Sequence, residues 1–224
     1  MNKLDRPGAS YHSSTLSLLA HQIHPNPLPV TLPIVSFAAD DYARAEPGIK
    51  GVIDLVKWEL WKWDEGVSSR HVLPPDADSL HNMALFGSSH PIASHLLTAR
   101  TTIIENLSMF SDELMEDLLS LPPTPSAYLT VHPSKLLPHL RAATLRSDIL
   151  PVFCGSAISH IGTELLMDYA GELLASPLDI DHETQKDRKA VRLLAWKVAW
   201  DKRKGWMTFV RVYSGKSFHV TWLS

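Results

Sequence analysis

Three features of the sequence predict an α/β fold followed by a small β segment. Residues 149–154 form a short apolar run that ends in a glycine turn and leads into helical spacing over residues 162–174, which is the strand, loop and helix order of α/β proteins. Helical spacing also covers residues 93–121. A polar linker at residues 176–190 then separates this part from two alternating segments joined by a turn.

Length and composition fit a folded protein with a sizeable core. The chain has 224 residues, 45% of them hydrophobic and 20% charged, which indicates neither general disorder nor a fibrous repeat. The net charge of -3 gives no global basic field, so contact with nucleic acid would need a local patch. The single cysteine, Cys154, excludes an intramolecular disulfide and indicates a buried thiol in a reducing compartment.

The first part of the chain is predicted to form one helix followed by three strands. Apolar residues at helical spacing over residues 14–23 indicate an amphipathic helix that ends at the prolines after it. Residues 30–37 and 51–56 predict strands, and residues 58–63 predict another, whose alternating tryptophans suit an antiparallel partner. Residues 66–91, rich in proline, serine and histidine, indicate a long loop or a poorly ordered insert.

The later part of the chain is predicted to be helical before it ends in a β-hairpin. Residues 93–121 and the segment after residue 134 indicate two or three helices, and a buried strand and a helix follow at residues 149–174. Alternating residues at 192–200 and 207–213, on either side of a basic turn, predict a hairpin that opens a second domain.

Residues 2–5 match the N-K-x-D pattern that reads guanine. The carboxylate of Asp5 can accept hydrogen bonds from both guanine N1–H and the 2-amino group, a donor pair that adenine lacks. Asn2 can bond the N7 side of the base and tie neighbouring loops together, and the stem of Lys3 can lie along the base. A strand that ends in a polar turn is the alternative for so short a pattern.

A second small-residue loop at residues 155–157 directly follows the predicted buried strand. Gly155, Ser156 and Ala157 let the backbone come close enough for an amide N–H to meet guanine O6, a contact that the amino group of adenine would disfavour. A plain glycine turn is the alternative for this loop alone. The two motifs together make a guanine site the stronger interpretation.

At these residues the chain resembles the elongation factor G group of ribosome-dependent GTPases. Several stretches are similar to family sequence and occur in the family's order, which makes coincidence implausible. They are residues 1–10, 49–57, 112–118, 150–157, 176–179 and 209–215.

The resemblance implies a partial P-loop GTPase domain at residues 1–175, with an inserted α+β subdomain at about 42–145. A linker at 176–190 and the truncated start of a β-barrel domain at 191–224 would follow. The residues that it assigns to the guanine base are Asn2, Lys3, Asp5, Ser156 and Ala157. No catalytic residue and no metal ligand of the family falls within the chain, so GTP and Mg would be cofactors of the full-length parent.

The chain departs from the family pattern at the phosphate loop. Gly215, Lys216 and Ser217 imitate the end of G-x-x-x-x-G-K-[ST], but Val210 stands where glycine is required. Residues 5–8 fit the D-x-x-G pattern that senses the γ-phosphate, but Asp5 is already assigned to the base. We therefore expect both switch regions to lie upstream of Met1 in a longer parent, and this chain alone to bind GTP weakly or not at all and not to hydrolyse it.

Within the family, the turn at residues 201–205 is more similar to the mitochondrial branch that disassembles ribosomes than to the translocase branch. This likeness implies the mitochondrial matrix, with the cytoplasm as the alternative, and the ribosome, rRNA and a ribosome recycling factor as partners, without membrane or DNA. Lys202, Arg203 and Lys204 suit contact with rRNA phosphates, with a solvated turn as the alternative. A translocase-type fragment, a non-catalytic ribosome-binding remnant and a broken gene product without a stable fold are the other interpretations.

Histidines and tryptophans are abundant but predict no separate site. With no H-E-x-x-H pattern and one cysteine, the histidines within residues 81–95 are predicted to be surface residues. Four tryptophans in strand-like apolar context are predicted to pack in the core and not to stack on RNA bases. They are Trp58, Trp61, Trp63 and Trp196.

Overall fold

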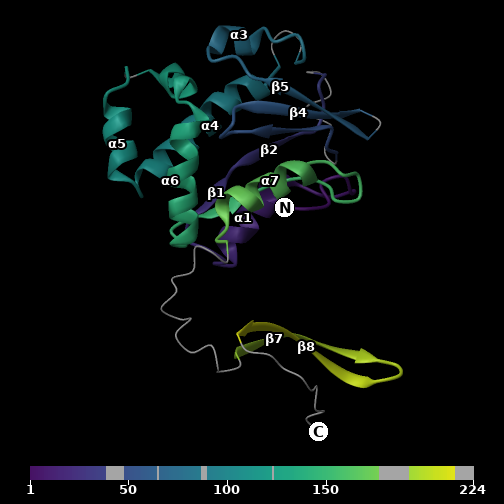
Figure 1. The fold of residues 1–224 in the computed structure, drawn as a ribbon. Coiled ribbons are helices and arrows are strands. Elements are labelled where there is room, and N and C mark those ends of the chain that lie inside the picture. Colours follow the sequence, from purple (N-terminus) through teal and green to yellow (C-terminus); the bar gives the residue numbers. More distant parts are fainter. Residues whose placement is uncertain (39–47, 65, 87–89, 123, 177–191, 215–224) are drawn as a thin grey trace. The chain divides into compact units, whose positions relative to one another are not determined.

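The computed structural model describes residues 1–38, 48–64, 66–86, 90–122, 124–176 and 192–214 (Figure 1). The chain divides into two compact units, Met1–Leu174 and Ala175–Ser224. Apart from residue 176, the predicted linker lies outside the described residues, as do the first residues of the predicted insert and residues 215–224.

The first unit combines helices with a parallel pair of strands and an antiparallel sheet, which confirms the predicted α/β class. Its strands are β1 (Pro27–Pro29), β2 (Thr31–Ile34), β3 (Gly51–Asp54), β4 (Glu59–Asp64), β5 (Val67–Val72) and β6 (Leu150–Val152). Its helices are α1 (Tyr11–Ala20), α3 (Ala77–His81), α4 (Ile92–Ser108), α5 (Asp112–Leu119), the 3-10 helix η1 (Pro125–Thr130), α6 (Pro133–Leu145) and α7 (Thr163–Leu173). No helix in the described part of the chain is long and apolar enough to cross a bilayer.

One residue joins the two sheets of this unit. β1 pairs with β6 in parallel, with Leu28 opposite Pro151, and β2, β3, β4 and β5 form an antiparallel sheet in chain order. Between β1 and β2, the buried Val30 donates to Val152 O at 2.9 Å, and its own carbonyl accepts from Leu55 N at 3.0 Å. The backbone therefore passes directly from the parallel pair into the antiparallel sheet.

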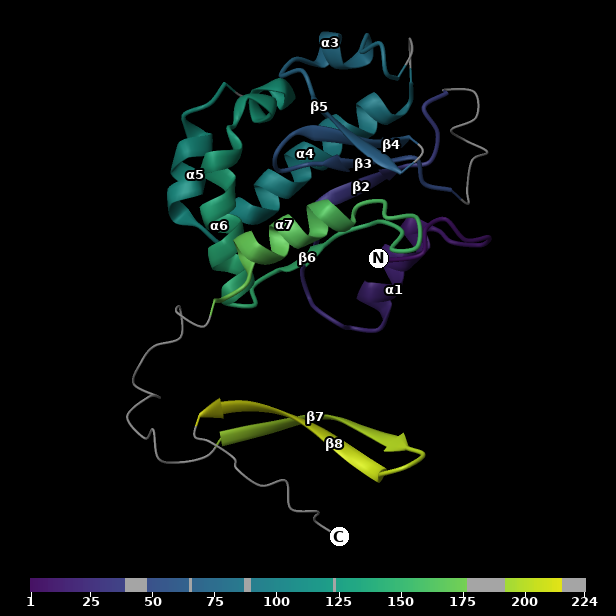
Figure 2. The ribbon, with the colours of Figure 1, turned by 45° about the vertical axis from the view of Figure 1, so that its right-hand side comes forward.

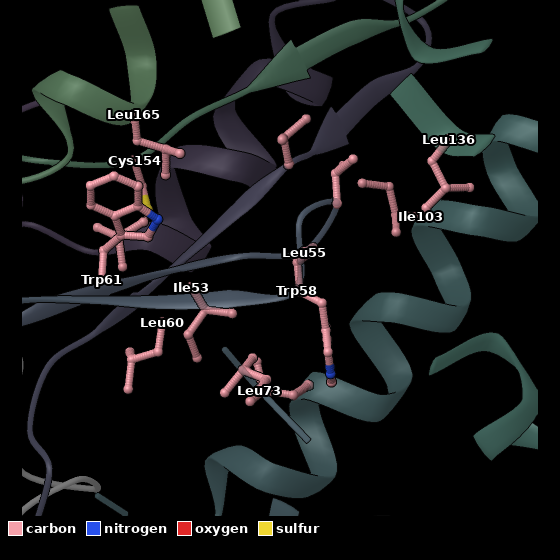
Figure 3. Close-up of a cluster of buried hydrophobic side chains, with 14 of the residues drawn as sticks. Ile53, Leu55, Trp58, Leu60, Trp61, Leu73, Ile103, Leu136, Cys154 and Leu165 are labelled. Carbon is pink, nitrogen blue, oxygen red and sulfur yellow. The ribbon is translucent and has the colours of Figure 1, made fainter. Parts of the chain in front are cut away.

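A continuous apolar core lies between the antiparallel sheet and the helices (Figure 3). Ile53 and Leu60 face each other across β3 and β4 and are fully buried, and Trp58 and Leu73 close the core near α4. Arg100 of α4 is also fully buried, with its guanidinium donating to the carbonyls of Leu55, Val56 and Val131. Those three backbone acceptors would otherwise be unsatisfied in the core.

Residues 66–91 are more regular than predicted. The segment contains β5 and α3, and its side chains Leu73, Leu80 and Phe86 are buried. The loop interpretation was therefore wrong over the described part of this segment. The prediction of surface histidines is also wrong for His90, which is buried against Phe86 and has Nε2 at 3.2 Å from Ser36 O.

The predicted hairpin is confirmed in the second unit. β7 (Arg192–Asp201) and β8 (Gly205–Ser214) are antiparallel, with Asp201 opposite Gly205 at the turn. The core placement of Trp196 is wrong, because this side chain is 63% exposed. A two-stranded hairpin has no second layer to cover its faces, so alternation in the sequence does not by itself bury a side chain.

Candidate functional site

The two loops predicted to form one site lie side by side. The Met1 amino group donates to Phe153 O, Gly155 N donates to Met1 O at 3.1 Å, and Leu4 N donates to Gly155 O at 3.4 Å. The first two bonds are the pattern of a parallel ladder, with Met1 opposite Cys154. β6 therefore continues past Val152 as the scaffold that positions residues 2–5 beside residues 155–157.

Asn2 ties the loops together through its side chain. Its Oδ1 atom accepts from Ala157 N at 3.0 Å and from Lys3 N at 2.7 Å. This is the loop-bridging role predicted for an asparagine at this position of the motif. The same bond engages the Ala157 amide, so this amide can reach guanine O6 only if it shares or exchanges its bond to Asn2.

The Ser156 amide is engaged as well. Ser156 N donates to Ile161 O at 2.9 Å and Ile161 N donates to Ser156 O at 3.0 Å, which closes the loop on itself. Gly155 is required by this closure, because a Cβ there would lie 2.4 Å from Ile161 O. The sequence analysis predicted a glycine here so that the backbone could approach a base. In the structure, glycine is needed first because the loop backbone passes close to Ile161 O.

One carboxylate oxygen of Asp5 has unused hydrogen-bonding capacity. Its Oδ1 is shielded from solvent and has no hydrogen-bond partner among the described residues. The Ser156 hydroxyl beside the carboxyl group holds the pKa of Asp5 below its usual value, against an opposing effect of burial. An ionised carboxylate accepts hydrogen bonds only, so this oxygen has an unused capacity for a donor.

Lys3 adopts a backbone conformation that is uncommon for its residue type. Its φ is +65°, in the left-handed region that usually suits glycine, and its side chain is exposed. A conformation of this kind is retained where the surrounding structure fixes it, often at binding sites. Here the Asn2 side chain accepts a hydrogen bond from the Lys3 amide and so fixes the start of the turn.

Cys154 and Thr31 are joined by two hydrogen bonds next to the site, which the sequence did not indicate. Cys154 N donates to Thr31 Oγ1 at 2.9 Å, and Thr31 Oγ1 lies 3.3 Å from Cys154 Sγ. The thiol is buried, as predicted, and burial raises its pKa to about 12. A neutral, inert thiol thus holds the strand from which residues 155–157 emerge.

The basic turn in the second unit is preformed. Asp201 Oδ1 accepts from Arg203 N at 2.8 Å and from Lys204 N at 2.9 Å. The three cations at the turn, Lys202, Arg203 and Lys204, are exposed. Such a turn presents adjacent positive charges at little conformational cost, which suits phosphate groups.

The residues present fit the base of a guanine nucleotide but not its phosphates. Asp5 offers the unpartnered oxygen described above, whereas the sequence contains no G-x-x-x-x-G-K-[ST] loop for a phosphate chain. Within the described ranges, no group of three histidine, cysteine, aspartate or glutamate side chains is arranged to hold a metal ion.

Comparisons with known proteins support the resemblance found in the sequence. No protein-family model matches the chain. The chain is 30% identical, over 96% of its length, to the mitochondrial ribosome-releasing factor 2 of Vanderwaltozyma polyspora and to that of Eremothecium gossypii. It spans only 27% and 26% of the length of these relatives.

A solved structure supports the fold. A crystal structure of a protein from Thermus thermophilus superposes with a TM-score of 0.57, covering 93% of this chain and 26% of that one at 19% identity. At this identity the likeness concerns the fold alone. It agrees with an α/β domain followed by a β segment.

Proposed function

We propose that this chain, which belongs to the elongation factor G group, supplies the half of the nucleotide site that reads guanine. The observation that carries the proposal is the unpartnered Oδ1 of Asp5, held beside a loop that Asn2 fastens through Ala157. A carboxylate oxygen left without a donor in a folded protein is a natural acceptor for a ligand.

Guanine matches this acceptor better than adenine does. Its N1–H and 2-amino group would donate to the two oxygens of Asp5. The side chain of Lys3 would cover the face of the base, and Ser156 and Ala157 would lie next to its O6 atom. Adenine presents an unprotonated N1 and carries no 2-amino group, so it would leave the carboxylate without donors.

Affinity for a whole nucleotide is expected to be low in this chain. Two bonds to a charged acceptor, at about 1.5 to 3 kcal/mol each before the entropic cost of binding, correspond to dissociation constants on the order of millimolar. In a complete site, Mg²⁺ and a phosphate loop would hold the phosphates and neutralise their charge. We expect no hydrolysis by this chain alone.

Base selectivity can be tested by titrating the isotope-labelled chain with guanosine, inosine and adenosine at millimolar concentration. Guanosine should shift the amide resonances of Ser156 and Ala157, and inosine, which lacks the 2-amino group, should bind several-fold more weakly because one donor to Asp5 is lost. Adenosine should shift neither resonance. Equal shifts with adenosine and guanosine, or micromolar GTP binding by calorimetry, would contradict the proposal.

In the full-length protein, the proposed activity is GTP-dependent disassembly of mitochondrial ribosomes. The names of the two relatives, both mitochondrial ribosome-releasing factors, favour this role over translocation. The proposed partners are the ribosome and a recycling factor, with the turn at residues 202–204 on rRNA. Light scattering of mitochondrial ribosomes should report their splitting by the full-length protein with GTP and recycling factor, whereas translocation activity without splitting would favour the alternative.

A further inference from the structure

The loop between β6 and α7 continues past the residues assigned to the base. Figure 2 shows this connection beside the first residues of the chain, in agreement with the bond from Gly155 N to Met1 O. Residues 158–160, which follow in the loop, are exposed, and the sequence indicated no role for them. One of them, Ser159, contacts the part of the loop that is assigned to the base through its amide and its hydroxyl group.

Both polar groups of Ser159 lie against the side chain of Ser156. Ser159 N donates to Ser156 Oγ at 3.4 Å, and the two hydroxyl oxygens lie 3.3 Å apart. Ser156 is buried, with 1% of its surface exposed, and its hydroxyl group is hydrogen-bonded to the carboxyl group of Asp5. These three residues therefore form a continuous hydrogen-bond chain from the surface of the protein to the carboxylate of Asp5.

The number of protons decides the direction of these hydrogen bonds. A serine hydroxyl donates one hydrogen bond and can accept two. An ionised carboxylate is a stronger acceptor than a second hydroxyl, so the Ser156 proton goes to Asp5. Ser159 then supplies two donors to Ser156 Oγ, its N–H and its O–H. Because its proton and its oxygen are both engaged, the Ser156 hydroxyl is held in one orientation, and each bond of the chain strengthens the next.

The backbone of the loop holds Ser159 in place for these contacts. Ser156 and Ile161 close the loop at its base, where the amide of each donates to the carbonyl of the other at 2.9 and 3.0 Å. Next to Ser159, the carbonyl of His160 accepts from the Thr163 hydroxyl at 3.0 Å, which fixes the loop to the start of α7. A side chain on a loop that is fixed at both ends loses little freedom when it forms a hydrogen bond.

We propose that Ser159 is a positioning residue for base recognition, which orients the Ser156 hydroxyl towards Asp5 and so fixes the carboxylate that reads guanine. This role rests on the proposed function of Asp5, whereas the hydrogen-bond chain itself is present without a nucleoside. Ser159 acts on the base only through the buried hydroxyl of Ser156. Its effect should therefore be measurable in the titration of Asp5 and in the affinity for guanosine.

The titration of Asp5 without any nucleoside tests the hydrogen-bond chain alone. Ser159→Ala keeps the amide and removes the hydroxyl, so the Ser156 proton is held less firmly on Asp5 and the pKa of Asp5 should rise, as measured by NMR of its carboxyl carbon. Ser159→Thr keeps the hydroxyl and should titrate like the unsubstituted chain. The charge of Arg6, which also lowers this pKa, is the same in all variants. An unchanged titration in Ser159→Ala would overturn the proposal.

The affinity for guanosine tests whether the hydrogen-bond chain serves the base. Ser159→Ala should weaken guanosine binding by about threefold, as followed by the Ala157 amide resonance, because one neutral hydrogen bond is lost, and Ser159→Thr should restore it. Ser13→Ala is the matched control, since Ser13 is also exposed and its amide donates to Oγ of the serine three residues before it, Ser10. An equal loss in Ser159→Ala and Ser159→Thr would contradict a role for the hydroxyl.

A double substitution separates positioning through Ser156 from a general effect on the loop. Ser156→Ala removes the intermediate hydroxyl, so the addition of Ser159→Ala should leave the titration of Asp5 where Ser156→Ala alone places it. A further rise of the pKa of Asp5 in the double variant would contradict the proposal. The two experiments fail separately: absence of guanosine shifts in the unsubstituted chain would refute the proposed function, and an unchanged Asp5 titration in Ser159→Ala would refute the hydrogen-bond chain.

Discussion

Two carboxylates of the first unit differ in how completely their oxygens are satisfied. Asp54, at the end of β3, is fully buried and accepts from Val56 N and Lys57 N at 2.8 Å, and from the Tyr169 hydroxyl at 2.8 and 2.9 Å. Asp5, in the loop before α1, keeps one shielded oxygen without a partner among the described residues.

The difference separates a carboxylate that is satisfied within the fold from one that keeps an unused acceptor. The donors around Asp54 come from its own turn and from α7, so this side chain fastens the antiparallel sheet to the helix. Asp5 keeps one oxygen without a donor among the described residues, and we propose that a ligand supplies the missing donor. The predictions below either break this distinction or make it sharper.

Removal of the Asp54 carboxylate should have the largest effect on stability. Asp54→Ala leaves the Tyr169 hydroxyl and two backbone amides unsatisfied in a dry site, so the free energy of unfolding should fall by about 3 to 5 kcal/mol. Asp5→Ala should cost less than about 1 kcal/mol. Urea denaturation of the two variants measures the difference, and equal losses would remove the distinction.

The raised pKa of Asp54 should make the stability of the protein depend on pH. Burial raises its pKa from 3.8 to about 6, so between these pH values the folded state holds a proton that the unfolded state has released. The free energy of unfolding should therefore fall as pH rises from about 4 to 6, by at most about 3 kcal/mol.

Asp54→Asn supplies the control for this pH dependence. The variant cannot ionise at the site, so its denaturation midpoint should lose this decline between pH 4 and 6. Asp5 acts in the opposite direction, because its lowered pKa contributes stability that is lost on acidification. A decline that persists unchanged in Asp54→Asn would show that another group causes it.

The tie between the two loops should be worth less than the Asp54 contacts. Asn2→Ala removes the acceptor of Ala157 N and should lower the free energy of unfolding by about 0.5 to 1.5 kcal/mol. The Ala157 amide should exchange faster, as measured by NMR. Asn82→Ala, at an exposed asparagine after α3, is the control and should leave Ala157 unchanged.

The basic turn should have the smallest effect on stability and a specific effect on RNA binding. Replacing Lys202, Arg203 and Lys204 by alanine removes exposed charges, so the free energy of unfolding should change by less than about 0.5 kcal/mol. If the turn contacts phosphates, the salt dependence of binding to an rRNA fragment should fall by about two to three counterions. Lys135→Ala, a cation on α6, is the control, and an unchanged salt slope in the triple variant would indicate a solvated turn.

The convergence of the two loops could be inferred from sequence because it rests on short motifs with fixed chemistry. Residues 155–157 follow the strand β6, and Asn2 fastens residues 2–5 to them through Ala157. Long periodic helices such as α4 and α7 were also predicted, because their apolar spacing is a local property of the chain.

Other features depend on contacts between residues far apart in the chain. β5 was missed because it is an edge strand with no buried residue, so its sequence lacks the alternation that identifies a strand. The buried Arg100 donates to the carbonyl of Val56, between β3 and β4, and to that of Val131, after η1. No sequence pattern connects these residues to Arg100. Likewise, the unpartnered oxygen of Asp5 follows from packing and not from the motif.

The base preference of an Asp5→Asn variant tests the central claim most directly. Xanthine carries an oxygen where guanine carries the 2-amino group, so an asparagine amide can donate to it while a carboxylate cannot. By NMR titration, Asp5→Asn should lose the guanosine shifts at Ala157 and gain shifts with xanthosine, whereas Asp168→Asn, on the exposed side of α7, should behave like the unsubstituted chain. An Asp5→Asn variant that binds guanosine as well as the unsubstituted chain would contradict the assignment of this carboxylate to the base.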